Sequence, residues 1–343
     1  MIRATRPRDG DSGSVPPSVP SIPAARLVGH DGPILDVEFT ADGKYALTGG
    51  NDRTVRLWNP MRIDPGYIDD GTGAIPPALP IQTYTNGHSH PVSAIAVDPH
   101  STTMITASDR TVVVTDIVSK RVKRRFHGHS GRINSVACSS NAETFLSAGY
   151  DGKIYIFDGR SWNASPIQIL DQATDSVTSV SVWQEGASAS EIITASVDGV
   201  VRYYDLRMGQ IRSDDVGDAI TGLAFTHDGH CSAATCLDGT IRLIERNSGE
   251  LLRQYSGGHQ AGNYGLEVTC TADDLHIVSG SEDGSVVLYD LVGGHVVQTL
   301  KGHDAKPTCA VAAHPKREET SVVISASYDG NAIVWASSLH ATQ

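Results

Sequence analysis

The sequence predicts an all-β fold, and a repeated turn with a regular spacing carries that prediction. A sharp turn containing an aspartate occurs seven times, at Asp52, Asp109, Asp151, Asp198, Asp238, Asp283 and Asp329. Successive aspartates are 57, 42, 47, 40, 45 and 46 residues apart, and each turn precedes a run of β-branched residues. A period of about 40–45 residues with four short strands is typical of one blade of a β-propeller. We therefore predict a single seven-bladed β-propeller.

The ends of the chain indicate how the ring closes. Residues 1–23 contain five prolines and little that could build a core, so we expect a disordered tail there. The propeller is expected over residues 24–337, with residues 338–343 as a second tail. Only eight residues follow Trp335, too few for an outer strand, whereas Arg26–Val28 precedes the first blade without a blade of its own. Pairing of this N-terminal strand with the last blade would remove an exposed sheet edge.

The blades are expected to differ mainly in their loops. Short β-branched runs predict the innermost strands at Ile34–Phe39, Val92–Val97, Ile133–Cys138, Val177–Val182, Ile220–Phe225, Leu266–Cys270 and Thr308–Ala312. Longer connections are expected at Pro60–Pro80 in blade 1, Gln184–Ser190 in blade 4 and Lys316–Ser321 in blade 7. Because strand direction alternates, all three lie on the face opposite the Asp turns, and such inserts often form a binding face.

Composition argues against several classes of function. The net charge of −12 and pI near 5.5 disfavour direct nucleic-acid or membrane contact by the body of the protein. The five cysteines lie singly in strand-like runs without a Cys-x-x-Cys pair, which favours reduced core thiols in the cytoplasm and nucleus. No apolar run approaches the ~18 residues that span a bilayer, and the N-terminus lacks a secretory signal. We expect no cofactor, no metal and a monomer within larger assemblies.

Several histidines resemble metal ligands or catalytic bases, but their positions favour a structural role. Each follows a glycine just before a blade: His30, His88, His129, His259 and His303. We expect a buried imidazole that hydrogen-bonds the turn aspartate of its blade and a nearby hydroxyl. The expected sets are His30, Thr48, Asp52 and Trp58 in blade 1; His129, Ser147 and Asp151 in blade 3; and His303, Ser325, Asp329 and Trp335 in blade 7. Blades 4 and 5 lack Gly-His and should be softer.

Two aromatic pairs are candidates for partner binding. Trp162 and Trp183 lie on the elaborated face of adjacent blades, and Trp183 could equally fill the space between blades 4 and 5. Tyr150 and Tyr328 precede turn aspartates on the opposite face, where they could line the channel mouth. Aromatic residues of either kind can anchor a partner.

The basic run Lys120–Arg125 is either a solvated outer edge protected by charge, a docking strip for an acidic partner or RNA, or part of a nuclear-import signal. The sequence does not choose between these alternatives.

The combined motifs resemble the WD-repeat family over residues 25–336. The resemblance rests on Gly-His, the turn aspartate, and an aromatic-acid or aromatic-amide pair at the end of the third strand, as in Trp58-Asn59, Phe157-Asp158 and Tyr289-Asp290. Residues 196–210 resemble more narrowly the family of mitogen-activated protein kinase organizers, WD-repeat proteins also associated with spliceosomes. That resemblance implies a non-enzymatic scaffold for kinase-cascade components or splicing factors. The Pro60–Pro80 insert and the tail depart from the organizer pattern.

A rival resemblance uses the same segment. Tyr204-Asp205-Leu206-Arg207 is similar to the Trp-Asp-x-Arg box of propellers that serve as substrate receptors of cullin-type ubiquitin ligases. In that family the arginine docks the ligase adaptor, which would give Arg207 that role. The box is short, and a tyrosine replaces the tryptophan.

Overall fold

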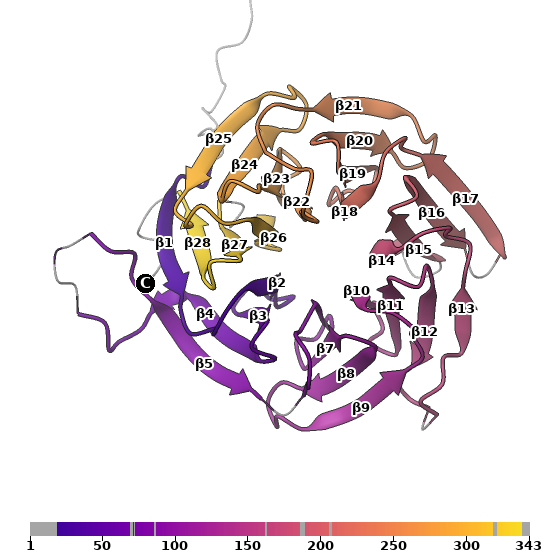
Figure 1. Ribbon diagram of the computed structural model, residues 1–343, viewed down its shortest axis with the longest axis horizontal. Helices are drawn as coiled ribbons and strands as arrows, with labels where there is room; N and C mark the ends of the chain where they lie inside the picture. The colour runs from indigo at the N-terminus through magenta and orange to yellow at the C-terminus, as the bar shows by residue number, and fades with distance from the viewer. Residues whose placement is uncertain are drawn as a thin grey trace, which may run out of the picture.

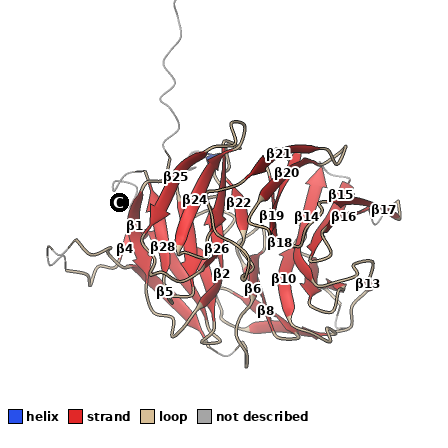
Figure 2. Ribbon diagram, turned by 45° about the horizontal axis from the view of Figure 1, so that its top comes forward, coloured by secondary structure: helices blue, strands red, loops and turns tan. Residues whose placement is uncertain are grey.

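The computed structural model is a closed ring of seven four-stranded antiparallel sheets, which confirms the predicted all-β propeller (Figure 1). It describes residues 19–337 except 69, 70, 72, 86, 162, 186–188, 206, 207 and 318–320. Strands make up nearly all of the regular structure, and loops join them at both faces of the ring (Figure 2). No helix in the described part of the chain is long and apolar enough to cross a membrane.

Each blade contributes one strand to each of four concentric layers. The innermost strands are β2 (Ile34–Phe39), β6 (Ala94–Val97), β10 (Ile133–Cys138), β14 (Val177–Glu185), β18 (Ile220–Phe225), β22 (Val268–Cys270) and β26 (Thr308–Ala313). The second strands are β3 (Ala46–Gly50), β7 (Thr103–Ser108), β11 (Thr144–Gly149), β15 (Ala189–Ser196), β19 (Cys231–Cys236), β23 (His276–Gly280) and β27 (Val323–Ser327). The third strands are β4 (Val55–Ile63), β8 (Thr111–Asp116), β12 (Ile154–Asp158), β16 (Val200–Asp205), β20 (Ile241–Glu245), β24 (Ser285–Asp290) and β28 (Ala332–Ala336). The outer strands are β5 (Ala78–Tyr84), β9 (Val122–His127), β13 (Gln168–Leu170), β17 (Gln210–Asp215), β21 (Leu251–Tyr255), β25 (Val296–Lys301) and β1 (Ile22–Leu27).

The N-terminal strand closes the ring as predicted. β1 pairs antiparallel with β28, with Ile22 opposite Ala336 and Leu27 opposite Ala332, so it is the outer strand of blade 7. It begins at Ile22, inside the segment expected to be a tail. Pro23 is tolerated because β1 is an edge strand and its register is irregular between Pro23 and Ala25.

The insert of blade 1 is shorter than the predicted Pro60–Pro80. β4 continues through Pro60 to Ile63 and β5 begins at Ala78, because the two prolines lie where the ladder between these strands is irregular. The connection projects outward from between β4 and β5 (Figure 1). It also returns to the closing strand, since the Arg26 amide donates to the Pro76 carbonyl at 2.7 Å. The insert therefore helps to hold β1 in place.

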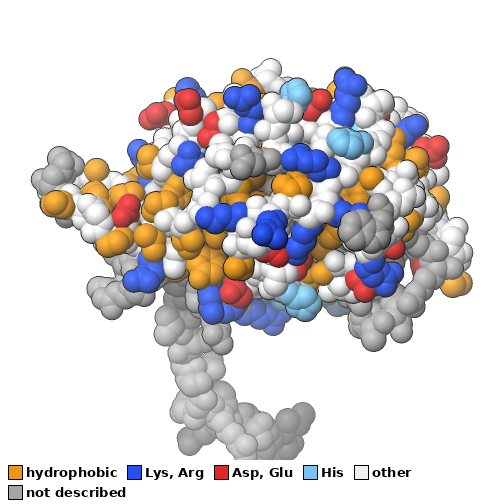
Figure 3. Space-filling model, turned by 90° about the horizontal axis from the view of Figure 1, so that it is seen from below, with side chains coloured by type: hydrophobic (Ala, Val, Ile, Leu, Met, Phe, Trp, Pro, Cys, Tyr) orange, Lys and Arg blue, Asp and Glu red, His pale blue; other side chains and the backbone are white. Residues whose placement is uncertain are grey.

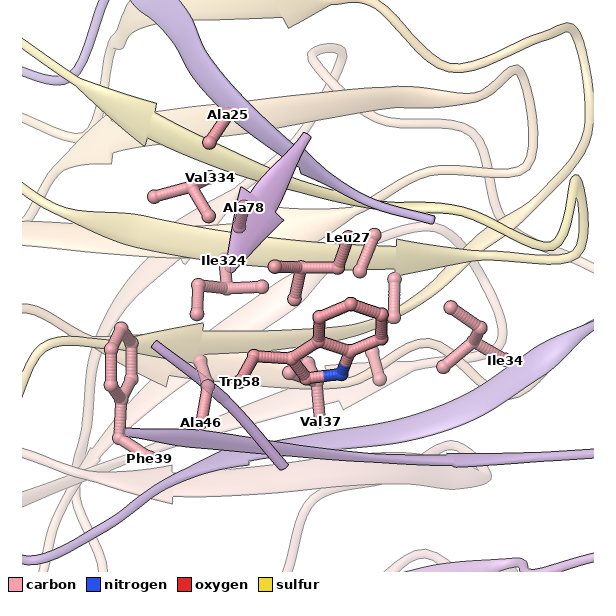
Figure 4. Close-up of a cluster of buried hydrophobic side chains, with 14 of the residues drawn as sticks. Ala25, Leu27, Ile34, Val37, Phe39, Ala46, Trp58, Ala78, Ile324 and Val334 are labelled. Carbon is pink, nitrogen blue, oxygen red and sulfur yellow. The ribbon is translucent and has the colours of Figure 1, made fainter. Parts of the chain in front are cut away.

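Apolar side chains fill the space between neighbouring blades. The cluster between blades 1 and 7 surrounds Trp58, which is 1% exposed and packs with Leu27 from β1 and with Ile34 and Val37 from β2 (Figure 4). Burying a large apolar side chain contributes about 1.5–3 kcal/mol. Because β1 supplies part of this cluster, ring closure also completes a piece of the core.

Candidate protein-binding site

The mouth of the central channel, on the face that carries the Asp turns, holds a cavity of about 380 Å³. Its apolar wall is formed by Leu35, Val197, Leu237, Tyr264 and Tyr328. Tyr264 and Tyr328 meet edge to face, with ring centroids 5.4 Å apart at 83°. Val197, Leu237 and Tyr264 are 36%, 37% and 39% exposed, so this wall combines apolar character with access from solvent.

The sequence predicted part of this wall and missed part of it. Tyr328 lines the cavity, as expected for an aromatic residue before a turn aspartate, whereas Tyr150 is 71% exposed and lies outside the cavity lining. Val197 and Leu237 occupy the same position before Asp198 and Asp238, so the turn alignment itself could have identified them.

Tyr264 lies in the loop before blade 6, which Glu282 holds. The Glu282 carboxylate accepts hydrogen bonds from the backbone amides of Asn263 and Tyr264, at 2.6 and 2.9 Å. Burial acts to raise the pKa of Glu282, but these hydrogen bonds outweigh it and hold the pKa below its ordinary value. The charged carboxylate therefore fixes the loop that presents Tyr264.

The mouth leads into an acidic channel of about 280 Å³. Asn134, Thr178, Thr221 and Glu267 line both spaces, which makes them continuous. Asp36 and Glu38 also line the channel, and the Asp36 carboxylate accepts the Ile95 amide at 2.5 Å. Burial raises the pKa of Asp36 to about 6 and that of Glu38 to about 8, and burial with the Asp36 and Glu38 charges raises the pKa of Glu267. The channel therefore carries less negative charge at pH 7 than its three carboxyl groups would have in water, and a cation entering it would favour their ionised forms.

No group of His, Cys, Asp and Glu side chains in the described part of the chain is arranged to hold a metal ion.

The predicted histidine groups of blades 1, 3 and 7 are present as hydrogen-bonded chains. In blade 7, Trp335 Nε1 donates to Ser325 Oγ at 2.7 Å, Ser325 Oγ lies 2.8 Å from His303 Nε2, and His303 Nδ1 lies 3.0 Å from Asp329. Because a carboxylate only accepts, Nδ1 carries the proton and Nε2 accepts from the hydroxyl. Every side-chain donor in this hydrogen-bonded network of blade 7 has an acceptor.

Blades 1 and 3 repeat this arrangement. In blade 1, His30 lies 3.0 Å from Asp52 and 2.7 Å from Thr48, and Trp58 donates to Thr48 at 2.9 Å. In blade 3, His129 bridges Asp151 and Ser147 at 2.9 and 2.8 Å. Phe157 cannot donate there, and the imidazole instead packs against Tyr155, with ring centroids 4.2 Å apart. Burial lowers the pKa of both His30 and His129, so both imidazoles are neutral at pH 7.

The expectation of an imidazole–aspartate bond is wrong for blades 2 and 6. In blade 2, β7 and β8 are joined by a two-residue turn, with Ser108 opposite Thr111. Asp109 has a φ of 47°, and its side chain is 42% exposed and paired with Arg110. His88 therefore bonds only Thr106, at 2.6 Å, among the described residues.

In blade 6 a tyrosine takes the place of the aspartate. His259 Nδ1 lies 2.8 Å from the Tyr289 hydroxyl, and Asp283 accepts the amide and hydroxyl of Ser285 instead. Tyr289 stands six residues after the turn aspartate, as Trp58 and Trp335 do, but its hydroxyl meets the imidazole itself, whereas the indoles donate to a hydroxyl.

Blades 4 and 5 replace histidine by arginine. Arg202 donates to both carboxylate oxygens of Asp198, at 3.1 and 2.7 Å, and Arg242 donates to Asp238 at 2.6 Å. Both arginines lie four residues after the aspartate, on the third strand of the blade. An arginine four residues after the turn aspartate is therefore the sequence signal for this ion pair.

The other candidate residues fall into two groups. Trp162 and Arg207 lie outside the described residues. Trp183 is half-buried between blades 4 and 5, where its ring lies against Gly229 and 5.2 Å from the Arg246 guanidinium. A Cβ on residue 229 would lie 1.9 Å from this ring, so only glycine fits there. Trp183 therefore packs between blades 4 and 5, which is one of the two roles expected for it from the sequence.

The five cysteines are free and lie apart from the mouth chemistry, except that Cys309 contributes to its wall. Burial raises the pKa of Cys138 and Cys270 to about 12 and that of Cys236 to about 11. At pH 7 these three thiols are protonated, and a protonated thiol is a poor nucleophile and metal ligand.

Comparison with known proteins places this geometry in a family. The WD domain, G-beta repeat family matches residues 22–59, 79–116, 120–158 and 294–336, and the anaphase-promoting complex subunit 4 WD40 domain matches residues 192–272. The chain is 39% identical to WD repeat domain-containing protein 83 of Rattus norvegicus over 311 residues, which cover 87% of this chain and 91% of the relative. The identity, length and coverage are the same for the Homo sapiens protein.

A more distant relative extends the match. The WD repeat domain-containing protein 83 homolog of Dictyostelium discoideum is 28% identical over 333 residues, which cover 90% of this chain and 96% of that protein. The seven-bladed ring and the length of these matches together show that the chain belongs to the WD repeat domain-containing protein 83 family of WD-repeat proteins.

Proposed function

We propose that this protein is a non-enzymatic scaffold that assembles kinase-cascade components or pre-mRNA splicing factors, in the cytoplasm and the nucleus. The observation that carries the proposal is the open apolar mouth above an acidic channel, on a rigid ring. The resemblance of residues 196–210 to the mitogen-activated protein kinase organizers supports the choice of partners.

The buried hydrogen-bond chains support a non-enzymatic function. Ser325–His303–Asp329 has the order of contacts of a serine-protease triad, and Ser147–His129–Asp151 repeats it. In both groups the serine is 0% exposed, so no substrate reaches its oxygen. Ser325 also accepts the Trp335 N–H. These groups tie together the strands and loops of blades 3 and 7 and leave binding to the surface.

The mouth has the properties of a site for a polypeptide with a basic side chain. Tyr264, Leu237 and Val197 offer apolar contact at the rim, and Glu267 lies where the mouth narrows into the channel. A side chain with an apolar stem and a charged end, such as lysine or arginine, matches that order of environments. Desolvated aromatic anchors contribute about 2 kcal/mol or more to an interface.

Affinity capture with the full-length protein tests the proposal. Nuclear and cytoplasmic extracts would be passed over the wild type and over a variant carrying Tyr264→Ala and Leu237→Ser, followed by quantitative mass spectrometry. We expect kinase-cascade or splicing proteins on the wild type, and about a thirtyfold loss on the mouth variant, which corresponds to about 2 kcal/mol. A matched control carries Tyr45→Ala and Leu275→Ser on the opposite face, where the two residues are 36% and 40% exposed.

Other outcomes contradict the proposal in distinct ways. Capture of a ligase adaptor together with a cullin would favour the substrate-receptor alternative. Loss of capture on Trp183→Ala but not on the mouth variant would place the site on the opposite face. Absence of any stable partner would remove the scaffold function.

A further inference from the structure

A strongly basic strip lies on the rim of blade 2, away from the mouth. Lys120–Arg125 contains five of the 27 Lys and Arg residues of a chain whose net charge is −12. It forms the turn before β9 and most of that outer strand. Figure 3 shows Lys and Arg side chains gathered on the rim, on the side where β5 and β9 lie in Figure 1.

The cations of the strip are held in place by neighbouring blades. Arg124 donates to the Ser161 carbonyl of blade 3, and Arg125 donates to the Gly87 carbonyl of the loop between blades 1 and 2 at 2.6 Å. These contacts fix the positions of the two guanidinium groups. Lys123 pairs with Asp116 at 2.9 Å, whereas Lys120 and Arg121 are exposed and make no ion pair with any described residue. Lys120 and Arg121 therefore leave positive charge exposed at the start of the strip.

The geometry of β9 suits an extended chain. Arg125 and His127 are exposed at alternate positions and share one face of the strand, whereas Lys123 lies at a register shift and its ammonium meets Thr103 and Asp116. Alternate residues of a strand are about 6.6–6.8 Å apart, which is also the spacing of alternate residues in an extended peptide. β9 is the outermost strand of its sheet, and no described strand pairs with its outer edge.

A cleft of about 220 Å³ lies beside the strip, between β5 and β9. Tyr84, Met104 and Val122 give it apolar walls, and Thr83 and His88 add polar atoms. His88 Nδ1 is buried and has no hydrogen-bond partner among the described residues, because the contact with Thr106 uses Nε2. The cleft thus offers room for one side chain and an unused polar atom.

We propose that the rim of blade 2 binds an extended acidic segment of a partner protein. Its carboxylates meet Lys120 and Arg121, and one of its side chains enters the cleft beside Val122. A polypeptide fits better than single-stranded nucleic acid, which binds through exposed aromatic platforms in addition to cations. The exposed aromatic residues of the described chain are Tyr45, Tyr150 and Tyr264, and none lies on this rim.

The test uses a fluorescein-labelled peptide in which glutamate alternates with threonine and leucine. Fluorescence anisotropy would compare the wild type with the double variant Lys120→Glu and Arg121→Glu. The reversal removes two attractions and adds two repulsions, so we expect at least about a tenfold loss of affinity. The matched control is Arg253→Glu with Lys301→Glu, which makes the same charge change on exposed positions of the outer strands β21 and β25.

Three further measurements decide the outcome. Wild-type affinity should fall as salt rises, and a peptide with glutamine in place of glutamate should not bind. Equal loss in the strip and control variants would overturn the proposal, as would the absence of saturable binding by the wild type. A labelled oligouridine that binds more tightly than the peptide, and is lost in the strip variant, would assign the surface to nucleic acid instead. Because the strip variant leaves the mouth unchanged, failure here is separate from failure of the scaffold proposal.

Discussion

Replacing Asp329 by alanine removes the centre of the hydrogen-bond network in blade 7. The Asp329 side chain is 2% exposed, and the His303 side chain that it holds is fully buried. The carboxylate accepts from His303 Nδ1 at 3.0 Å, from the Asp304 amide at 3.2 Å and from the Asn331 amide at 2.8 Å. The variant leaves all three donors without this acceptor.

The loss of folding stability in Asp329→Ala comes mainly from the His303 imidazole. Asp304 is exposed and Asn331 is partly exposed, so water can replace the carboxylate at their amides. Water cannot easily reach His303 Nδ1, and a hydrogen bond to a charged group contributes about 1.5–3 kcal/mol. The turn is also weakened by the loss of its two amide contacts, so we expect Asp329→Ala to lower the free energy of unfolding by about 2–4 kcal/mol in all.

Thermal unfolding compared with Asp283→Ala isolates this effect. Asp283 occupies the same turn position in blade 6, but its partners are the serines Ser285 and Ser281 and no imidazole depends on it, so its loss should cost about 1 kcal/mol. For a ring spanning residues 19–337, an unfolding entropy of about 2.1 cal/mol/K per residue makes 1 kcal/mol equal to about 1.5 °C. We therefore expect Tm to fall by about 3–6 °C for Asp329→Ala and by about 1.5 °C for Asp283→Ala.

A double-mutant cycle would show whether the stranded imidazole is the cause. In a His303→Asn background, Asp329→Ala should cost less than in the wild type, with a coupling of about 1 kcal/mol or more. Equal Tm shifts for Asp329→Ala and Asp283→Ala, or an additive cycle, would refute the reasoning.

Three further predictions concern pH, closure and the arginine blades. Burial lowers the pKa of His88 to about 4, below its ordinary 6.5, so the folded protein resists a proton that the unfolded chain accepts. The neutral His88 therefore contributes its full stability above about pH 6.5, and this contribution declines as the pH falls toward 4. In denaturant titrations between pH 7 and 5, the free energy of unfolding of the wild type should fall by up to about 2 kcal/mol more than that of His88→Gln. Deleting residues 1–18 should leave Tm nearly unchanged, whereas deleting residues 1–28 removes β1 and should lower Tm by many degrees; equal melting would contradict the closure argument. Arg202→Met leaves the half-buried Asp198 without its ion pair and should cost about 2–3 kcal/mol, while an unchanged denaturation midpoint would show that this pair adds nothing.

The ring could be predicted from the sequence because its signals are local and repeated. Each turn aspartate marks one hairpin, and the segment at Arg26–Val28, which has no blade of its own, indicated the strand that pairs with the last blade. The boundaries of the N-terminal tail and of the blade 1 insert were harder to predict. Prolines suggested a tail up to residue 23 and an insert from Pro60 to Pro80, yet edge strands tolerate proline where the ladder is irregular.

The histidine groups show where local pattern stops being sufficient. The Gly-His and turn-aspartate motifs are complete in blade 6, but the hydroxyl of Tyr289 intervenes. In blade 2 the aspartate is present, but a two-residue turn directs it outward. In blade 6 the outcome depends on which side chain meets the imidazole, and in blade 2 it depends on the conformation of the turn; the motifs alone specify neither.

The mouth could also be predicted only in part, because its wall is assembled from residues of several blades. An aromatic residue before a turn aspartate, such as Tyr328, is a recognisable signal for the channel mouth. Val197 and Leu237 line the same cavity, but as aliphatic residues they carry no such signal. Their role follows from the ring, which brings the same position of several blades to one rim. The acidic channel has a similar origin, since Asp36 and Glu267 are far apart in sequence and line one space only after closure.

The two proposed surfaces differ in charge, and this difference bears on how a scaffold works. The channel below the mouth is lined by the carboxyl groups of Asp36 and Glu267, which a cationic group would hold in their ionised forms, whereas the strip at Lys120–Arg125 favours carboxylates. The mouth lies on the axis of the ring, and the strip lies on its circumference. A partner suited to one surface is repelled by the charge of the other, so the two do not compete for one ligand. A rigid ring that separates opposite charges in this way can hold two unlike proteins at once without changing its own shape.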